Sequence, residues 1–170
     1  MKGLIGGRTA SDMPGLDIAE QKSWQNFLGT ALRLYAVLNR RLMETHQLSL
    51  ADVRLLHILS NSPGGSARMG DLRSALPALP SRLTRQIRRL EAQELVERGA
   101  SPEDRRGVIA TITAAGRTLC ERAMVTYAHD VRSNFLGPLS RPQIGALQDT
   151  CQRIIAPLKQ AERAAKLPRD

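Results

Sequence analysis

The sequence predicts a mostly α fold (α+β) with one small β-hairpin. Hydrophobic residues make up 42% of the 170 residues, and aromatic residues only 3%. Leu and Ala dominate the apolar set, which suits packed helices better than a sheet sandwich. Apolar residues recur at steps of three and four over several long segments, which is the period of a helix. One short segment, from Val108 to Ile112, instead contains the β-formers of a hairpin strand.

The first expected element is a long helix that follows a flexible arm. Residues 1–16 contain four Gly and one Pro and show little periodicity. A helix is predicted from Asp17 to Thr45. Its apolar residues keep helical steps and are Trp24, Phe27, Leu28, Ala31, Tyr35, Leu38 and Leu42. Because a helix of this length cannot bury its apolar stripe within a small domain, we expect it to pack against other long helices or a second subunit.

The middle of the chain predicts three shorter helices and a small strand. Ser49 begins the first helix with a capping-box pattern in which Asp52 replaces the usual Glu. A proline and two glycines end this helix. The other elements are expected in the order small strand at 67–69, short helix at 70–76 and a third helix from Pro80, a residue favoured at the first helical position.

A hairpin and two further helices complete the expected elements. The strands of the hairpin are predicted at Glu94–Arg98 and Gly107–Thr113. Thr113 is a suitable N-cap for a long amphipathic helix. Ser140 caps a last helix, which Pro157 is expected to kink or end early.

These elements predict a small lobe between long flanking helices. The expected divisions are a flexible arm (1–16), an N-terminal dimerisation helix (17–48), a compact lobe of three helices and a hairpin (49–113), C-terminal dimerisation helices (114–164) and a tail (165–170). The flanking helices carry apolar stripes that need partners. An intertwined two-fold homodimer is the most economical arrangement for them.

The charge of the chain favours a polyanionic partner. The net charge is +9 and the pI about 10.7, so nucleic acid or an anionic membrane would be attracted, although a merely basic protein remains an alternative. No apolar run approaches the ~20 residues that span a bilayer. The first residues also lack the apolar core of a secretory signal. We therefore expect a cytoplasmic protein without a membrane partner.

The stretch from Leu79 to Thr113 is the most informative part of the chain. Its helix separates two sets of residues three and four positions apart: Arg82, Arg85 and Arg89 on one face, and Leu83, Ile87 and Leu90 on the other. At the tip of the hairpin, Arg105 and Arg106 add two guanidinium groups. A helix sized for the major groove beside a basic hairpin is the layout of a winged helix-turn-helix that binds double-stranded DNA.

Four segments, in this order and spacing, resemble the MarR (multiple antibiotic resistance regulator) family. They are LSLADVRLLHIL, MGDLRSAL, LPSRLTRQIRRLEAQELVER and SPEDRRGVIATITAAGRTL. DRRG matches the D-x-R-G wing motif of the family, and TAAGR matches its entry into the long dimer helix. The resemblance covers about Trp24 to Ile155. It implies a dimeric winged helix-turn-helix transcription regulator, with the role of a repressor, that binds palindromic operators and often responds to small ligands.

The sequence departs from the family at one position before the recognition helix. Leu79 stands where the family often has Ser, so the helix lacks a side-chain N-cap. A missing cap costs on the order of 1 kcal/mol. This departure concerns the entry of the helix and leaves the resemblance intact.

Candidate DNA contacts follow from the position of each side chain along the recognition helix. The first turns contain Ser81, Arg82, Thr84 and Arg85, which are expected to meet base edges. Arg82 and Arg85 are the candidates for bidentate contacts with guanine, though one of them could hold only a phosphate. Arg88 and Arg89 lie further along and are expected to contact phosphates or stay solvated. Ser66, Arg68 and Ser74 are secondary candidates for phosphate contacts.

The hairpin tip provides candidates for the minor groove. Gly107 permits a tight turn, and Asp104 can pair with a neighbouring arginine to hold the shape of the loop. Either Arg105 or Arg106 can then enter a narrow A·T-rich minor groove, which attracts guanidinium groups. Spacing does not choose between them, but the resemblance favours Arg106, the arginine of D-x-R-G.

The resemblance also implies a ligand site where the long helices meet the lobe. Trp24, Arg33, Tyr35 and His57 are the candidates there, and together they would suit a small aromatic or anionic effector. The alternative is that Trp24 and Tyr35 only pack and that His57 is an ordinary helix histidine. The sequence does not identify an effector.

Cys120 and Cys151 show no metal-binding spacing, and no cluster with histidine is present in the sequence. Both cysteines lie among apolar residues, so inert packing is the leading interpretation and oxidant sensing the alternative. No metal or cofactor is expected. The motifs of common enzyme classes are missing from the sequence as well. The main alternative function is a winged-helix module that binds protein or RNA without reading duplex DNA.

Overall fold

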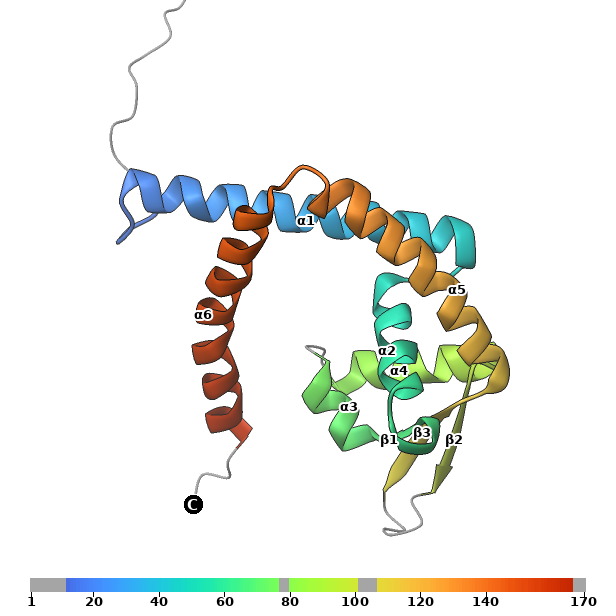
Figure 1. Cartoon of the computed structure of the whole chain (residues 1–170). Helices are drawn as coiled ribbons and strands as arrows, with labels where there is room; N and C mark the ends of the chain where they lie inside the picture. Colours follow the sequence, from blue (N-terminus) through green and yellow to red (C-terminus); the bar gives the residue numbers. More distant parts are fainter. Residues whose placement is uncertain (1–11, 77–79, 101–106, 167–170) are drawn as a thin grey trace, which may run out of the picture. The chain divides into compact units, whose positions relative to one another are not determined.

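The computed structural model describes residues 12–76, 80–100 and 107–166. The elements are α1 (Ile18–His46), α2 (Leu50–Ser60), the 3-10 turn η1 (Pro63–Gly65), β1 (Ser66–Arg68), α3 (Met69–Ala75), α4 (Pro80–Ala92), β2 (Val96–Ala100), β3 (Val108–Ile112), α5 (Ala114–Val131), the π-helical turn η2 (Arg132–Leu136) and α6 (Arg141–Lys166) (Figure 1). The predicted class, mostly α with a small sheet, is confirmed. Contacts divide the chain into two compact units, and the boundary along the chain lies within α5, between Tyr127 and Ala128.

Capping boxes begin the first two helices. Asp17 accepts a hydrogen bond from the Glu20 N–H, and the Glu20 carboxylate accepts one from the Asp17 N–H. Ser49 and Asp52 make the same reciprocal pair at α2, as the sequence predicted. In both places the side chains satisfy N–H groups that have no partner within the helix. The predicted beginnings of α1 and α2 are therefore confirmed.

The core of the first unit is built mainly from leucines of α1, α2, α3 and α4. Its fully buried side chains include Leu42, Leu48, Leu55, Leu56, Leu59, Leu72, Leu83 and Leu90. Helices α2, α3 and α4 gather beside the small sheet (Figure 1). The burial of these side chains removes apolar surface from water, which is the dominant stabilising contribution to such a lobe. This core holds α4 in place and leaves its opposite side exposed.

The sheet has the strand order β1-β3-β2, and both pairs are antiparallel. The predicted hairpin is confirmed, but its first strand begins at Val96 rather than at Glu94. Glu94 has a φ of 59° and lies in the turn that leaves α4. The small strand and the short helix each begin one residue earlier than predicted, at Ser66 and Met69.

Thr113 joins the sheet to α5. Its hydroxyl accepts a hydrogen bond from the Gly116 N–H at 2.9 Å and donates one to the Glu94 carbonyl at 2.8 Å. The Thr113 N–H also donates to the Leu95 carbonyl at 3.1 Å. The predicted N-cap is confirmed, and it ties the start of α5 to the turn after α4.

Helix α6 corrects the prediction made for Pro157. The helix does not end early but continues through this proline to Lys166. A proline inside a helix removes one backbone hydrogen bond. The flanking sequence Ala-Pro-Leu-Lys-Gln-Ala is otherwise rich in helix formers, so the helix continues on both sides.

The two cysteines have different surroundings. Cys120 is buried, and burial, followed by the charge of Glu121, raises the pKa of its thiol. Inert packing is the expected behaviour of such a thiol. Cys151 is exposed on α6, so the prediction that it packs in a core is wrong for the chain on its own. None of the described helices has an apolar stretch long enough to cross a membrane.

His46 is expected to make the stability of the fold depend on pH. Its Nε2 lies 2.8 Å from the Thr126 Oγ1, which joins the end of α1 to α5. Burial, followed by the charges of Arg122 and Arg41, lowers the pKa of His46 below its usual 6.5. Among the described residues, its buried Nδ1 has no hydrogen-bond partner. The unfolded chain therefore takes up this proton at a higher pH, and stability should fall as the pH drops from 6.5 through the lowered pKa.

Thermal melting of the wild type and of His46→Gln would test this expectation. Between about pH 7.5 and about pH 5.5, the melting temperature of the wild type should fall more than that of His46→Gln. His57→Gln, on an exposed part of α2, is the control and should behave like the wild type. Equal falls for the wild type and His46→Gln would contradict the assignment to His46.

Candidate nucleic-acid interface

Helix α4 has one buried side and one exposed side, as the sequence predicted. Leu83, Ile87 and Leu90 are buried. The exposed residues are Ser81, Arg82, Arg85, Arg88 and Arg89, and Thr84 is half-buried. The Thr84 hydroxyl donates to the Pro80 carbonyl at 3.0 Å, so it still has lone pairs to offer an incoming donor. The burial of Leu83, Ile87 and Leu90 thus leaves Arg82, Arg85 and Arg88 on the exposed side of α4.

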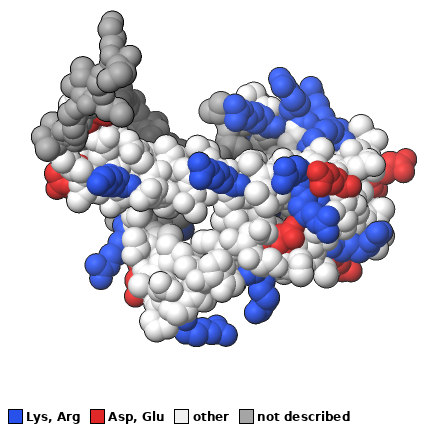
Figure 2. All heavy atoms as spheres, turned by 90° about the horizontal axis from the view of Figure 1, so that it is seen from above, with Lys and Arg blue, Asp and Glu red and all other residues white. Residues whose placement is uncertain are grey.

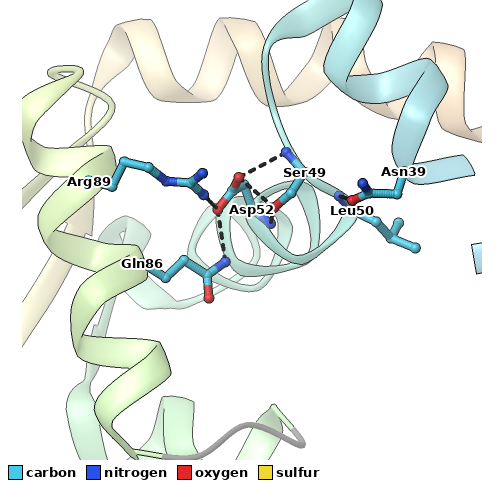
Figure 3. Close-up of polar contacts among 6 residues, drawn as sticks. All are labelled: Asn39, Ser49, Leu50, Asp52, Gln86 and Arg89. Carbon is cyan, nitrogen blue, oxygen red and sulfur yellow. Dashed lines mark hydrogen bonds and ion pairs between the residues drawn. The ribbon is translucent and has the colours of Figure 1, made fainter. Parts of the chain in front are cut away.

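Arg89 has a partner inside the protein. Its guanidinium donates to the Oδ1 of Asp52, and the same oxygen accepts a hydrogen bond from the Gln86 Nε2 at 3.0 Å (Figure 3). Asp52 is only 1% exposed, so its carboxylate depends on donors from the protein rather than on water. The sequence suggested a phosphate contact or a solvated side chain for Arg89, whereas the structure commits its guanidinium to this buried carboxylate.

The secondary candidates on β1 and α3 have partners of their own. The Ser66 hydroxyl lies 2.8 Å from the Thr111 Oγ1 across the β1–β3 pair. The Ser74 hydroxyl donates to the Gly70 carbonyl at 3.2 Å. The Ser74 hydroxyl therefore has its donor in use, whereas either hydroxyl of the Ser66–Thr111 pair can be the donor; both serine oxygens can still accept a hydrogen bond. Arg68 is exposed at the end of β1.

A pocket of about 480 Å³ lies between α3, α4 and the β2–β3 hairpin. Its lining includes Arg68, Arg73, Thr84, Arg98, Gly107 and Val108. Three arginines and one carboxylate residue, Asp71, therefore line one hollow, and the Arg98 guanidinium also lies 3.6 Å from the Glu91 carboxylate. Arg73 and Arg98 were not singled out from the sequence. Arg98 could be placed only through the strand register that pairs it with Ala110.

The tip of the hairpin lies largely outside the described residues. Asp104, Arg105 and Arg106 are among those not described, and so is Leu79 before α4. Gly107 is the first described residue after the tip; it is half-buried and lines the pocket. The roles predicted for the wing arginines therefore stay predictions.

Within the part of the chain that the structure describes, no hydrogen bond, ion pair or ring contact joins the four residues predicted to form a ligand site. Trp24 and Tyr35 are both about half exposed on α1, at 45% and 51%. They lie 11 residues apart in the sequence, which is about 16 Å along a helix. Trp24 instead packs beside Phe27, with ring centroids 6.2 Å apart. Arg33 is exposed, and the exposed His57 lies within 3.3 Å of the Asn61 amide nitrogen.

The overall charge does not by itself locate an interface. Figure 2 shows a face on which most atoms belong to neither basic nor acidic residues, and Lys and Arg lie in several places rather than in one patch. The exposed side of α4 and the neighbouring arginine-lined pocket remain the places where basic groups and a shaped surface coincide.

Comparison with known proteins agrees with this arrangement. A family model described as MarR family matches residues 46–107. The chain is 37% identical over 97 residues to the HTH-type transcriptional repressor Rv2887 of Mycobacterium tuberculosis, which covers 56% of this chain and 67% of that protein. It is 26% identical over 85 residues to the multiple antibiotic resistance protein MarR of Escherichia coli, covering 50% of this chain and 59% of that protein.

Solved structures extend the likeness over most of the chain. AbsC, a MarR family transcriptional regulator from Streptomyces coelicolor, gives a TM-score of 0.81 at 29% identity, covering 87% of this chain and 99% of AbsC. Sco3205 from the same organism, solved in complex with DNA, gives 0.80 at 29% identity, covering 86% of this chain and 91% of its own. The chain therefore belongs to the MarR family of transcriptional regulators.

Proposed function

We propose that this chain is a sequence-specific transcriptional repressor that binds a palindromic operator in double-stranded DNA as a homodimer. The observation that carries the proposal is the arrangement of α4, whose leucine and isoleucine side is buried while its arginines are exposed. A helix of this kind fits the major groove. Sco3205, which shares the fold at 29% identity, was solved bound to DNA.

Base reading is assigned to the first turns of α4. Arg82 and Arg85 are exposed, and a guanidinium group can bind guanine through two hydrogen bonds at once. Ser81 and Thr84 add shorter polar contacts in the same turns, and Arg88 reaches a phosphate. Asp104 and Gly107 shape the wing, and Arg105 or Arg106 enters the minor groove. Arg68, Ser66 and Ser74 are supporting phosphate contacts.

The homodimer is inferred from the apolar stripe of α1. In the second half of the helix the stripe is buried, through Leu38 and Leu42. Nearer the N-terminus of the helix, the same helical spacing presents Trp24, Phe27, Leu28, Leu32 and Tyr35, and all of these are exposed. In α6, Ile154, Ile155 and Leu158 are exposed as well. A second copy of the chain offers the same apolar surfaces, so a two-fold pair buries both sets.

A small aromatic or anionic effector is part of the proposal. Three of the residues that line the 480 Å³ pocket are arginines, whose guanidinium groups would suit the carboxylate of such a molecule. The pocket adjoins α4, so an occupant would compete with DNA or change the position of the helix. Trp24 and Tyr35 would then serve the dimer contact, and Arg33 and His57 would be ordinary exposed helix residues. The proposal places the protein in the cytoplasm, with the DNA, and assigns it no catalytic activity.

Substitution of the two candidate base readers is the direct test of this function. Footprinting on the DNA that flanks the gene would first locate the operator. Arg82→Ala and Arg85→Ala should each lower the preference for operator over scrambled duplex by roughly 5- to 150-fold, which corresponds to about 1–3 kcal/mol per bidentate base contact. The measurement is a gel-shift titration of each variant on both duplexes in matched salt.

The same titrations include a control variant and also test the alternative function. Arg40→Ala removes the same charge from an exposed position on α1 and should leave the preference unchanged. An equal loss on operator and scrambled DNA would make α4 a phosphate binder rather than a base reader. Competition by single-stranded RNA, with no preference among duplexes, would favour the alternative of an RNA-binding module.

A further inference from the structure

Asp52 accepts hydrogen bonds from two different helices with a single buried carboxylate. Its Oδ2 accepts from the Ser49 N–H at 2.8 Å and from the Ser49 hydroxyl at 2.6 Å. Its Oδ1 accepts from the Gln86 Nε2 at 3.0 Å and from the Arg89 guanidinium (Figure 3). Four donors occupy a group that has about four lone-pair sites. The hydrogen-bonding capacity of this carboxylate is therefore used in full.

The capping box alone does not require the contacts with α4. Oδ2 completes the N-terminus of α2, while Oδ1 faces α4 and binds only its side chains. A buried carboxylate without further donors would be costly, so the α4 side chains are held close to Oδ1. The structure thus gives Asp52 a second task besides capping, which is to fix α4 against α2.

The two anchored side chains lie on the part of α4 that continues from the candidate base readers. Gln86 is four residues after Arg82, and Arg89 is four residues after Arg85, so each pair are neighbours along the helix surface. Two side chains bound to one oxygen restrict the rotation of α4 about its own axis. A rotation of about 10° would move atoms on the helix surface, about 5–6 Å from the axis, by about 1 Å. Base recognition tolerates an error of only about that size.

The anchor continues from α2 to the long helix α1. The Asn39 Oδ1 accepts a hydrogen bond from the Leu50 N–H at 2.9 Å, so α1 holds the first turn of α2 (Figure 3). All three helices belong to the first compact unit. A chain of hydrogen bonds through Asp52 therefore links α4 to α2, and through Asn39 to α1, the helix with the exposed apolar stripe.

We infer that Asp52 is a positioning residue for DNA recognition, which sets the rotation of α4 through Gln86 and Arg89 and so decides which base edges Arg82 and Arg85 reach. The inference rests on the proposed function. It makes Asp52 a determinant of sequence preference although its side chain is buried and touches no DNA. It also assigns Arg89 to the protein and not to a phosphate.

The test removes the α4 donors to Asp52 and compares the effect on DNA binding with that of removing the Ser49 cap. Gln86→Leu and Arg89→Met each delete one donor to Oδ1. Ser49→Ala deletes the hydroxyl bound to Oδ2 and leaves both α4 donors in place, so it is the matched control. Each folded variant is titrated on operator and scrambled duplex over a range of salt concentrations. Amide hydrogen exchange of α4 is measured without DNA.

The expected result is a selective loss of preference. Gln86→Leu and Arg89→Met should lower the ratio of operator to scrambled affinity at least about fivefold, with the salt dependence unchanged, and should speed exchange in α4. Ser49→Ala should change the ratio by less than about twofold. The inference is overturned if the ratio is unchanged in both α4 variants. It is also overturned for Arg89 if its loss weakens both duplexes equally and reduces the salt slope by about 1, as for a phosphate contact.

The same data separate this inference from the proposed function. If the wild type shows no preference for any duplex, the proposed function fails. The exchange rates of α4 then still decide whether Asp52 anchors that helix, because they require no DNA. A wild type that prefers its operator, together with α4 variants that keep the preference, rejects only the positioning role.

Discussion

Gly116→Ala is expected to lower the free energy of unfolding by about 3 kcal/mol or more. A Cβ built on Gly116 would lie 2.1 Å from the Leu95 carbonyl oxygen and 3.0 Å from the Ile112 Cγ1. The first neighbour is backbone and already accepts a hydrogen bond from the Thr113 N–H. The Leu95 carbonyl cannot move away without breaking its hydrogen bond to Thr113, which joins the turn after α4 to the start of α5. The loss should therefore exceed that of an ordinary change in helix propensity.

Thermal and denaturant unfolding of the purified variant measure this effect. A destabilisation of about 3 kcal/mol corresponds to a fall in melting temperature of about 6–12 °C for a chain of this size. Gly70→Ala is the control in the same compact unit, because nothing lies within 4 Å of its added Cβ. That variant should be as stable as the wild type or slightly more stable. A melting temperature of Gly116→Ala equal to that of Gly70→Ala would show that the junction can relax.

Much of the fold could be predicted because local sequence patterns decide it. The capping box of Ser49 and Asp52, the proline at the start of α4 and the N-cap Thr113 each act within a few residues, and all three lie where the sequence placed them. Leucine spacing likewise predicted the buried side of α4. The errors arose where the preference of a single residue competed with that of the residues around it. Pro157 disfavours a helix at one position, but its neighbours favour one on both sides.

The candidate site was less predictable because its contacts join distant parts of the chain. Asp52 could be identified as a cap from its distance to Ser49, but its contact with Arg89 spans 37 residues. Arg98 reaches the pocket only because β2 pairs with β3 in one particular register. The periodicity of a helix or a strand does not show which distant residues come into contact. Charge patterning predicted which helix would be basic and could not tell which of its arginines is bound inside the protein.

Leu32→Glu is expected to convert the proposed dimer into monomers and to weaken operator binding by about 100-fold or more. Leu32 is 61% exposed within the apolar stripe of α1. A second chain that packs on this stripe would have to bury the new carboxylate without a partner, which is strongly unfavourable. Two half-sites read by unlinked monomers lose the gain in affinity that comes from joining them. Analytical ultracentrifugation and gel shifts at matched protein concentrations measure the two consequences.

Thr30→Glu is the matched control, since it adds the same charge to an exposed position of the same helix outside the row formed by Trp24, Phe27 and Leu28. It should remain dimeric and keep its affinity for the operator. Dissociation of both variants would indicate that any added charge on this part of α1 disrupts the dimer. If Leu32→Glu stays dimeric, the apolar stripe of α1 is not part of the interface. A wild type that sediments as a monomer would overturn the homodimer itself. If Leu32→Glu is folded, monomeric and still prefers its operator over scrambled DNA, then α4 reads its half-site alone, and dimerisation contributes affinity but not the ability to discriminate bases.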